Sequence, residues 1–277
     1  MSLSKPIFYV VPVCPFSQRV QIMLALRDQS DAIEIREVDI TKPRSPELLQ
    51  KTGGSTSLPV LELPDGTILK ESLVILRFLD ESLEGKMLRR SDPLEHSIEN
   101  MLITMYEGPF TASGYLYIMN QDAERKHEFH EKILSIYKGV DNFLVKHNPH
   151  GTWLFDEFGL AEAVFTPLFK RFWFLEYYED FELPYSDEYT RVKKWRDACM
   201  IHPSTNQVSK EEIVKTYYDY AHGLGNGRLG PGRKLSTAVF HPHWKDRPWP
   251  PRDKYSGRIC SDEELGLSSG VEEHLNQ

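Results

Sequence analysis

The spacing of apolar residues changes near residue 82, and this change constrains the fold most. Before it, short β-branched or aromatic runs alternate with helical stretches, and after it apolar residues recur at three- and four-residue spacing. We therefore predict an α/β domain at 1–82, a linker at 83–92 and an all-helical, all-α domain with an irregular C-terminal tail at 93–277. A chain of 277 residues can bury two such cores.

Seven elements are predicted in the first domain. Strands are expected at 7–11, 33–40, 60–63 and 67–69, and helices from Pro15, over 46–51 and over 72–83. Pro15 suits the first turn of a helix, because its missing N–H costs nothing there. The order β-α-β-α-β-β-α, a parallel unit followed by a hairpin and a helix, is the thioredoxin-like arrangement.

Five helices are predicted in the second domain, at 93–120, 123–147, 160–178, 188–201 and 210–222. The third has the most regular apolar spacing and is the expected core helix. Pro167 lies inside it and predicts a kink or a late start. Glycine and proline are dense from residue 223, so we expect an irregular but ordered tail that wraps the domains.

Composition argues against several partners and sites. A formal net charge of −8 disfavours nucleic acid and anionic membranes. No apolar stretch approaches the roughly 20 residues that span a bilayer, and the N-terminus lacks the apolar core of a signal peptide. The three cysteines, Cys14, Cys199 and Cys260, form no CxxC pair or Cys/His cluster. We therefore expect no disulfide framework, no metal site and a reducing, cytoplasmic location.

Cys14-Pro15-Phe16-Ser17 joins the first predicted strand to the first helix. A thiol there faces the free N–H groups and the positive end of the helix, and both favour the thiolate. Ser17 stands where a dithiol oxidoreductase would have its second cysteine, so Cys14 is expected to form a mixed disulfide with a small thiol. The alternative is that Cys14 is a small buried hydrophobic residue.

Two further segments suit a peptide-like thiol ligand. Leu58-Pro59 precedes the third strand, and in thioredoxin-like folds this proline is cis and the backbone before it pairs with a bound peptide. Glu71-Ser72 marks the start of the domain's last helix, where free N–H groups and the Ser72 hydroxyl could hold a carboxylate and Glu71 an ammonium group. An ordinary trans proline and a simple N-cap are the alternatives. A ligand with both charges and a thiol is glutathione.

With these motifs the whole chain resembles the glutathione transferases, specifically their cysteine-using, omega-like branch. The resemblance implies a glutathione co-substrate and a homodimer. The glutathione-binding residues that it implies are Cys14, Pro15, Phe16, Lys42, Leu58, Pro59, Glu71 and Ser72. Among them, Cys14 would meet the glutathione sulfur and Lys42 the glycine carboxylate. Before the predicted core helix the family's capping box reads Gly159-Leu160-Ala161-Glu162, so glycine would be the N-cap.

A closer resemblance is to the bacterial glutathione-dependent thioether lyase of lignin β-aryl ether degradation. The segments that carry it are 51–54, 70–72, 172–175, 217–220 and 247–254. That enzyme removes glutathione from an α-glutathionyl aryl ketone, so the resemblance implies an aromatic glutathione thioether as substrate. It also accounts for the long tail, which ordinary omega-like enzymes lack.

Such a lyase would use the Cys14 thiolate to attack the substrate's glutathione sulfur, which leaves an enolate. The enolate needs a donor near the ketone oxygen, and Tyr217 is the expected catalytic residue. The aromatic residues expected to line the acceptor pocket are Tyr106, Phe110, Tyr115, Tyr217 and Tyr218. The alternative for these aromatics is core packing.

Three other functions remain compatible with the sequence. The same thiol would serve a general omega-like thioltransferase or a dehydroascorbate-type reductase. A glutathione-binding, redox-sensing module would use the fold without catalysis. A conjugating transferase would use a hydroxyl in place of the thiol, and Tyr9 or Ser17 are candidates that we rank below Cys14.

Overall fold

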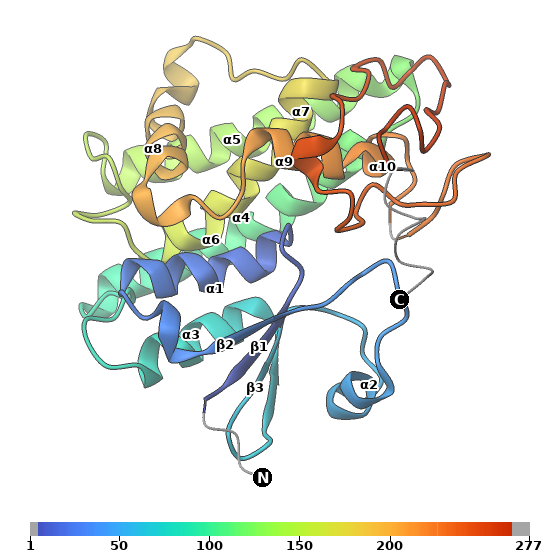
Figure 1. Cartoon of the computed structure of the whole chain (residues 1–277). Coiled ribbons are helices and arrows are strands. Elements are labelled where there is room, and N and C mark those ends of the chain that lie inside the picture. The colour runs from blue at the N-terminus through green and yellow to red at the C-terminus, as the bar shows by residue number, and fades with distance from the viewer. Residues whose placement is uncertain (1–4, 226, 268–277) are drawn as a thin grey trace.

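A mixed sheet forms the base of the first domain in the computed structural model, which describes residues 5–225 and 227–267 (Figure 1). The strands are β1 (Ile7–Val10), β2 (Glu34–Glu37), β3 (Val60–Glu62) and β4 (Ile68–Lys70). They lie in the order β2-β1-β3-β4, with β1 parallel to β2 and antiparallel to β3. Every residue of β1 is buried, since it is a central strand covered on both faces.

Three helices cover this sheet: α1 (Pro15–Leu26), α2 (Pro46–Thr52) and α3 (Ser72–Ser82). Helices α1 and α3 lie on the face toward the helical region, and α2 covers the other face (Figure 1). The thioredoxin-like fold is therefore confirmed, and each predicted element ends within a few residues of its observed bounds.

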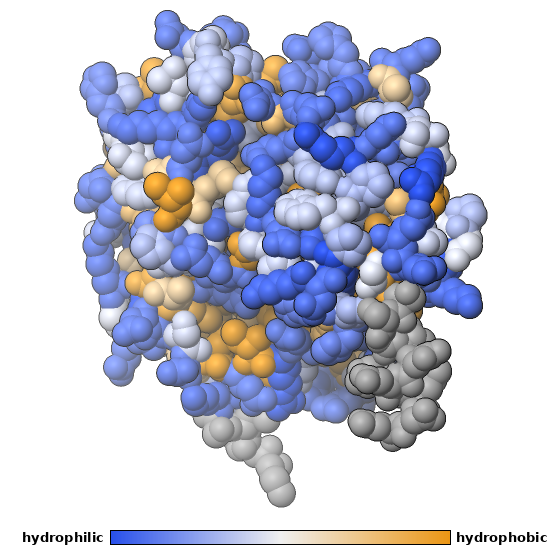
Figure 2. Space-filling view, turned by 45° about the horizontal axis from the view of Figure 1, so that its top comes forward, coloured by the Kyte–Doolittle hydropathy of each residue, from blue (hydrophilic) through white to orange (hydrophobic). Residues whose placement is uncertain are grey.

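The helical region begins with α4 (Pro93–Met119), and a single 3-10 turn, Ala123–Arg125, leads into α5 (Lys126–His147). The remaining helices are α6 (Leu160–Arg171), α7 (Trp173–Tyr178), α8 (Thr190–Ile201), α9 (Lys210–Thr216) and α10 (Tyr218–Ala221). In this region the structure is mostly helical, as predicted. None of the helices among the described residues has the length and apolar character needed to cross a membrane. The face in Figure 2 is mostly hydrophilic with scattered apolar patches.

Two predicted helices are each divided in the structure. The expected helix at 160–178 is interrupted at Phe172, between α6 and α7, and not at Pro167. The Phe172 ring stacks on Phe110 at 4.7 Å, over Gly114, where a Cβ atom would lie 2.1 Å from the ring. The expected helix at 210–222 is interrupted at Tyr217, which separates α9 from α10.

The start of α6 is capped by a residue from another helix. Glu162 Oε2 accepts the Gly159 N–H at 2.9 Å, as the capping box predicts. Glycine has no side chain to complete the box, and Glu99 of α4 replaces it by accepting the N–H groups of Leu160 at 3.0 Å and Ala161 at 3.2 Å. A Cβ at residue 159 would lie 3.0 Å from Glu99 Oε1, so glycine makes room for this carboxylate.

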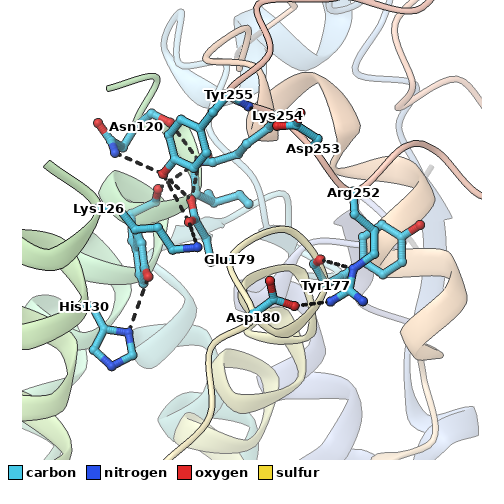
Figure 3. Close-up of polar contacts among 12 residues, drawn as sticks. Asn120, Lys126, His130, Tyr177, Glu179, Asp180, Arg252, Asp253, Lys254 and Tyr255 are labelled. Carbon is cyan, nitrogen blue, oxygen red and sulfur yellow. Dashed lines mark hydrogen bonds and ion pairs between the residues drawn. The ribbon is translucent and has the colours of Figure 1, made fainter. Parts of the chain in front are cut away.

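The tail from Gly223 forms no α-helix in its described part, and ion pairs fasten it to the helical region. Arg233 contacts Asp219 at 3.3 Å and Asp262 at 2.5 Å. Lys254, fully buried, contacts Glu179 at 2.5 Å, close to Tyr255 and Asn120 (Figure 3). The prediction of an irregular but ordered tail holds for these residues, and its last ten residues lie outside the described ones.

Candidate active site

Cys14 lies between β1 and α1 and is the N-cap residue of α1. Its N–H donates to the Val11 carbonyl at 2.9 Å, and its own carbonyl accepts the Gln18 N–H at 3.2 Å, so the turn that carries the thiol is fixed at both ends. Cys14 is half-buried, whereas Cys199 and Cys260 are buried. Burial raises the pKa of Cys199 well above its usual value, so Cys199 stays a protonated, inert thiol.

Two adjoining cavities meet at α1. The glutathione-side cavity, about 650 Å³, is lined by five of the eight residues implied by the resemblance: Phe16, Leu58, Pro59, Glu71 and Ser72. The Cys14 cavity, about 530 Å³, contains Cys14 and Pro15. Phe16 and Leu58 line both cavities, so a ligand can reach from one into the other.

Lys42 is the one implied glutathione-binding residue that lines neither cavity. Its side chain is 77% exposed and its ammonium group pairs with Asp39 at 3.4 Å. Three other cations line the walls: Arg19 and Lys70 in the glutathione-side cavity and Arg44 in the Cys14 cavity. Lys42 therefore lies outside both cavities, whereas the arginine two positions later lines the Cys14 cavity.

The backbone at the glutathione-side cavity has two special conformations. The Leu58–Pro59 peptide bond is cis, as expected. Glu71 has a φ of 68°, in the left-handed region that non-glycine residues rarely adopt. Such conformations concentrate at ligand-binding sites, where surrounding contacts hold them. The Ser72 hydroxyl at the start of α3 is buried and accepts a hydrogen bond from Arg19 at 3.1 Å.

Arg19 is a site residue that the sequence analysis missed. It lies within α1 and is 1% exposed, a position that apolar spacing does not predict for an arginine. Its guanidinium also donates to the Val164 carbonyl at 3.2 Å and pairs with the Glu107 carboxylate. Burial lowers the pKa of Arg19, while Glu107 and then a Cys14 thiolate oppose that shift. An arginine side chain remains charged at neutral pH even when its pKa is lowered in this way. A fixed positive charge therefore lies near the thiol.

Tyr115 of α4 and Tyr217, at the break between α9 and α10, line the Cys14 cavity. Their hydroxyl groups are 3.0 Å apart, and that of Tyr217 is 3.5 Å from the Val13 carbonyl. Burial, and then the Tyr217 phenol, raise the pKa of Tyr115 well above its usual value. Tyr115 therefore stays protonated at neutral pH, and the pair can donate a hydrogen bond to an oxygen in the cavity.

Three of the predicted pocket aromatics lie elsewhere. Phe110 is fully buried and packs on Phe172. Tyr106 meets the ring of Phe143 edge-on at 6.3 Å. Tyr218 is also fully buried, and its hydroxyl accepts the Cys260 N–H at 2.8 Å. Phe110 and Tyr218 are therefore core residues, and the half-buried Tyr106 packs against the edge of the core.

Arg171, at the end of α6, is a second arginine missed from the sequence. It is fully buried and donates to the Val13 carbonyl and to Gln18 Oε1, the latter at 2.8 Å. Its guanidinium also lies over the Tyr217 ring at 6.0 Å. Arg171 thus contacts both the turn that carries Cys14 and the ring of Tyr217. Apolar periodicity gave no signal for it.

The comparisons with known proteins point to glutathione S-transferases. Residues 13–82 match the family model described as "Glutathione S-transferase, N-terminal domain". The first domain therefore resembles the N-terminal domain of that family. Glutathione is the co-substrate in this family, and the cavities at α1 contain the residues expected to receive it.

Relatives extend the similarity beyond the first domain. A "Probable glutathione S-transferase" of Solanum tuberosum is 26% identical over 206 residues, 74% of this chain and 91% of that protein. "Glutathione S-transferase omega-1" of Sus scrofa is 30% identical over 97 residues, 35% of this chain and 39% of that protein. The solved structure of glutathione transferase Omega 2C from Trametes versicolor has a TM-score of 0.66 at 16% identity, covers 78% of this chain and 98% of its own, and shows the shared fold.

Proposed function

We propose that this protein is a member of the glutathione S-transferase family, a glutathione-dependent lyase/thioltransferase that removes glutathione from an α-glutathionyl aryl ketone. The observation that carries the proposal is the Cys14 cavity, where a thiol at a helix N-terminus shares one space with the hydrogen-bonded pair Tyr115 and Tyr217. A thiol alone would support disulfide exchange. The hydrogen-bonded phenol pair adds the donor that an enolate requires.

The first half-reaction forms a mixed disulfide. The Cys14 thiolate attacks the sulfur of the thioether, a sulfur–sulfur bond forms and the carbon–sulfur bond breaks. The carbon keeps the electron pair, which delocalises onto the ketone oxygen as an enolate. Hydrogen bonds from the tyrosine pair stabilise that oxygen, and a solvent proton then completes the ketone.

The second half-reaction restores the enzyme. The thiolate of free glutathione attacks the glutathionyl sulfur on Cys14, which releases oxidised glutathione and the Cys14 thiolate. Over the cycle the thioether carbon gains two electrons and two glutathione molecules lose them. We propose that the substrates are aromatic thioethers from lignin ether breakdown, and that the protein acts as a homodimer in the cytoplasm.

A general thioltransferase is the second candidate, and one observation favours it. The 30% identity to the pig omega-1 transferase covers 97 residues, a third of this chain. The walls of the Cys14 cavity from α4, the α9–α10 break and the tail would distinguish a lyase from a thioltransferase. Comparing phenacyl-glutathione with a small mixed disulfide of glutathione as substrates separates the two functions.

Substitution Cys14→Ser tests the shared mechanism. We expect cleavage of phenacyl-glutathione to fall by at least about 1000-fold, because the covalent step is lost. Oxidised glutathione should add one glutathionyl group to the wild-type protein and none to the variant, as measured by intact mass. Cys199→Ala is the control, because Cys199 is buried in the helical core. Full activity in the Cys14→Ser protein would reject the mechanism.

A further inference from the structure

A third cavity, which we call the tail chamber, adjoins the Cys14 cavity. Its volume is about 430 Å³. The residues that line both spaces are Ile40, Arg44, Thr216, Tyr220 and Ala238. Five shared wall residues make the tail chamber a continuation of the Cys14 cavity, on the side away from the glutathione-side cavity.

The roof of the tail chamber is a fixed part of the tail. Ser236, Thr237 and Ala238 line it. Asp219 Oδ2 accepts the Ser236 hydroxyl at 3.0 Å and the Thr237 N–H at 2.8 Å. Arg247 Nη1 donates to the Thr237 carbonyl at 2.6 Å. Two buried charged groups, Asp219 and Arg247, thus hold the roof in place from both sides. The tail chamber is therefore a cavity with a fixed wall and not an open surface.

The lining of the tail chamber is mixed. Ile40 and Leu224 provide apolar surface, and Thr41, Thr56 and Thr237 provide hydroxyl groups. Such a lining suits a flat ring that carries oxygen substituents, because the apolar side chains can cover its faces while the hydroxyls reach its edge.

Arg44 stands at the boundary between the two cavities and is half-buried. Its guanidinium donates to the carbonyls of Asp39, Lys42 and Thr56, each at 3.4 Å. These are long bonds to neutral acceptors. Within the described part of the chain no carboxylate pairs with Arg44. A charged oxygen would replace those bonds with shorter and stronger ones.

We infer that the aryl ring of the acceptor extends past Arg44 into the tail chamber, and that Arg44 binds an anionic oxygen on that ring, a phenolate or a carboxylate. This inference rests on the proposed function and adds the class of acceptor. The rival role for Arg44 is the glycine carboxylate of glutathione. Against that role, Arg44 lines the Cys14 cavity and the tail chamber but not the glutathione-side cavity.

The test compares two acceptors, phenacyl-glutathione and its ring para-carboxylate analogue, with the full-length chain. The measured quantity is the ratio of their kcat/KM values. We expect Arg44→Met to lower the preference for the carboxylate at least about tenfold, because a charge-assisted hydrogen bond is lost. Arg44→Lys keeps the charge and should restore part of the preference. An unchanged ratio in Arg44→Met would overturn the inference.

Lys42→Met is the matched control, because Lys42 carries the same charge two residues away but lines neither cavity. An equal change of the ratio in both variants would mean a long-range charge effect and would overturn the direct role of Arg44. The rate at which oxidised glutathione modifies Cys14 measures the glutathione side separately. If Arg44→Met lowers that rate as much as it lowers cleavage of the carboxylate, Arg44 binds glutathione and the inference is wrong.

A second variant tests the passage itself. Ala238 lies in the wall of both cavities, so Ala238→Phe should narrow the connection and slow the para-carboxylate acceptor more than phenacyl-glutathione. Equal slowing of the two acceptors would contradict the path. If the wild-type chain cleaves neither acceptor, the proposed function fails. If it cleaves both and Arg44→Met leaves the ratio unchanged, the inference alone fails.

Discussion

The two sides of the cleft are built in different ways. The expected glutathione contacts come from short segments of the first domain: the turn at Cys14, the cis bond at Leu58–Pro59 and the start of α3 at Ser72. Each is a backbone feature set by its immediate neighbours in sequence. Helix α4 completes the wall of this cavity with Glu107, Gly108, Thr111 and Ala112. The acceptor side joins Tyr115 on α4, Tyr217 after α9 and Ala238 in the tail.

The comparison shows where each side is vulnerable. Local motifs set the backbone of the glutathione side, and the tail does not line its cavity, so a change in the tail should leave it intact. The acceptor side exists only while α4, the α9–α10 break and the tail stay packed together. Substitutions in the tail should therefore slow cleavage of the acceptor more than they slow modification of Cys14 by oxidised glutathione. The variants that follow test this difference.

The largest effect is expected for Lys254→Met. Lys254 Nζ contacts Glu179 and donates to the carbonyls of Ile118 at 2.6 Å and Asn120 at 2.8 Å, at the end of α4 (Figure 3). The substitution leaves the Glu179 carboxylate buried without its closest cation. We expect the free energy of unfolding to fall by about 3–5 kcal/mol, measured by urea denaturation.

In the folded Lys254→Met protein, binding of the acceptor and reaction with glutathione should change by different amounts. The KM for phenacyl-glutathione should rise, since the last turns of α4 carry Tyr115, whereas modification of Cys14 by oxidised glutathione should change little. Lys126→Met is the control. Lys126 lies 3.5 Å from the same Glu179 carboxylate but is 38% exposed, so a loss below about 1 kcal/mol is expected. Equal losses of unfolding free energy in the two variants would contradict the claim that Lys254 is the main partner of the buried Glu179 carboxylate.

Glu99→Gln should remove a pH dependence of stability. Burial, and then the Glu162 carboxylate, raise the pKa of Glu99 to about 7 from 4.5, against the opposing N–H groups of Leu160 and Ala161 and the Arg90 guanidinium. The folded state thus holds a proton that the unfolded state loses. The contribution of Glu99 to stability is fully present below pH 4.5 and is lost as pH rises through about 7, by about 3 kcal/mol in all.

Glutamine keeps an acceptor for the α6 N–H groups but cannot ionise, so the Glu99→Gln protein should lose this part of the decline between about pH 5 and about pH 8. Urea denaturation at the two pH values measures it. The exposed Glu182→Gln is the control and should follow the wild type. Because α6 packs against both α1 and α4, this effect should reach both sides of the cleft. A wild-type decline retained in Glu99→Gln would assign the titration to another group.

The sequence predicted the fold and the backbone geometry of the first domain well because their signals are local. A proline after Cys14, a Leu-Pro pair before a strand and a Glu-Ser pair at a helix start each dictate nearby backbone geometry. Apolar periodicity failed for Arg19, because α1 is covered on one side by the sheet and on the other by α6. A helix buried on both sides must place polar residues in the interior, and their partners come from another domain.

The acceptor side was predicted only in part for a related reason. Tyr115 and Tyr217 face the Cys14 cavity, but Phe110 and Tyr218 are buried in the core and Tyr106 lines neither cavity at α1. The directions of neighbouring tyrosines depend on the helix break at Tyr217, and the pattern at 210–222 predicts one continuous helix. Arg44 and the tail roof were missed, because the tail chamber exists only through contacts between the tail and the first domain.

The smallest effect, and the most specific, is expected for Tyr217→Phe. The substitution keeps the ring beside Arg171 but removes the hydroxyl 3.0 Å from that of Tyr115. Turnover of phenacyl-glutathione should fall by about 10- to 100-fold, since a donor to the developing enolate is lost, while modification of Cys14 by oxidised glutathione should stay within about twofold. Rapid single-turnover kinetics measure the chemical step directly.

Tyr218→Phe makes the matched comparison for Tyr217→Phe. Its hydroxyl accepts the buried Cys260 N–H at 2.8 Å, so this variant should lose about 1–3 kcal/mol of stability by leaving that donor without a partner. Its turnover should remain close to that of the wild type. The two variants would then show that Tyr217 acts in the chemical step and that the adjacent Tyr218 acts in packing. If Tyr218→Phe slows cleavage as much as Tyr217→Phe does, both act through packing and the enolate donor must be sought elsewhere in the cavity.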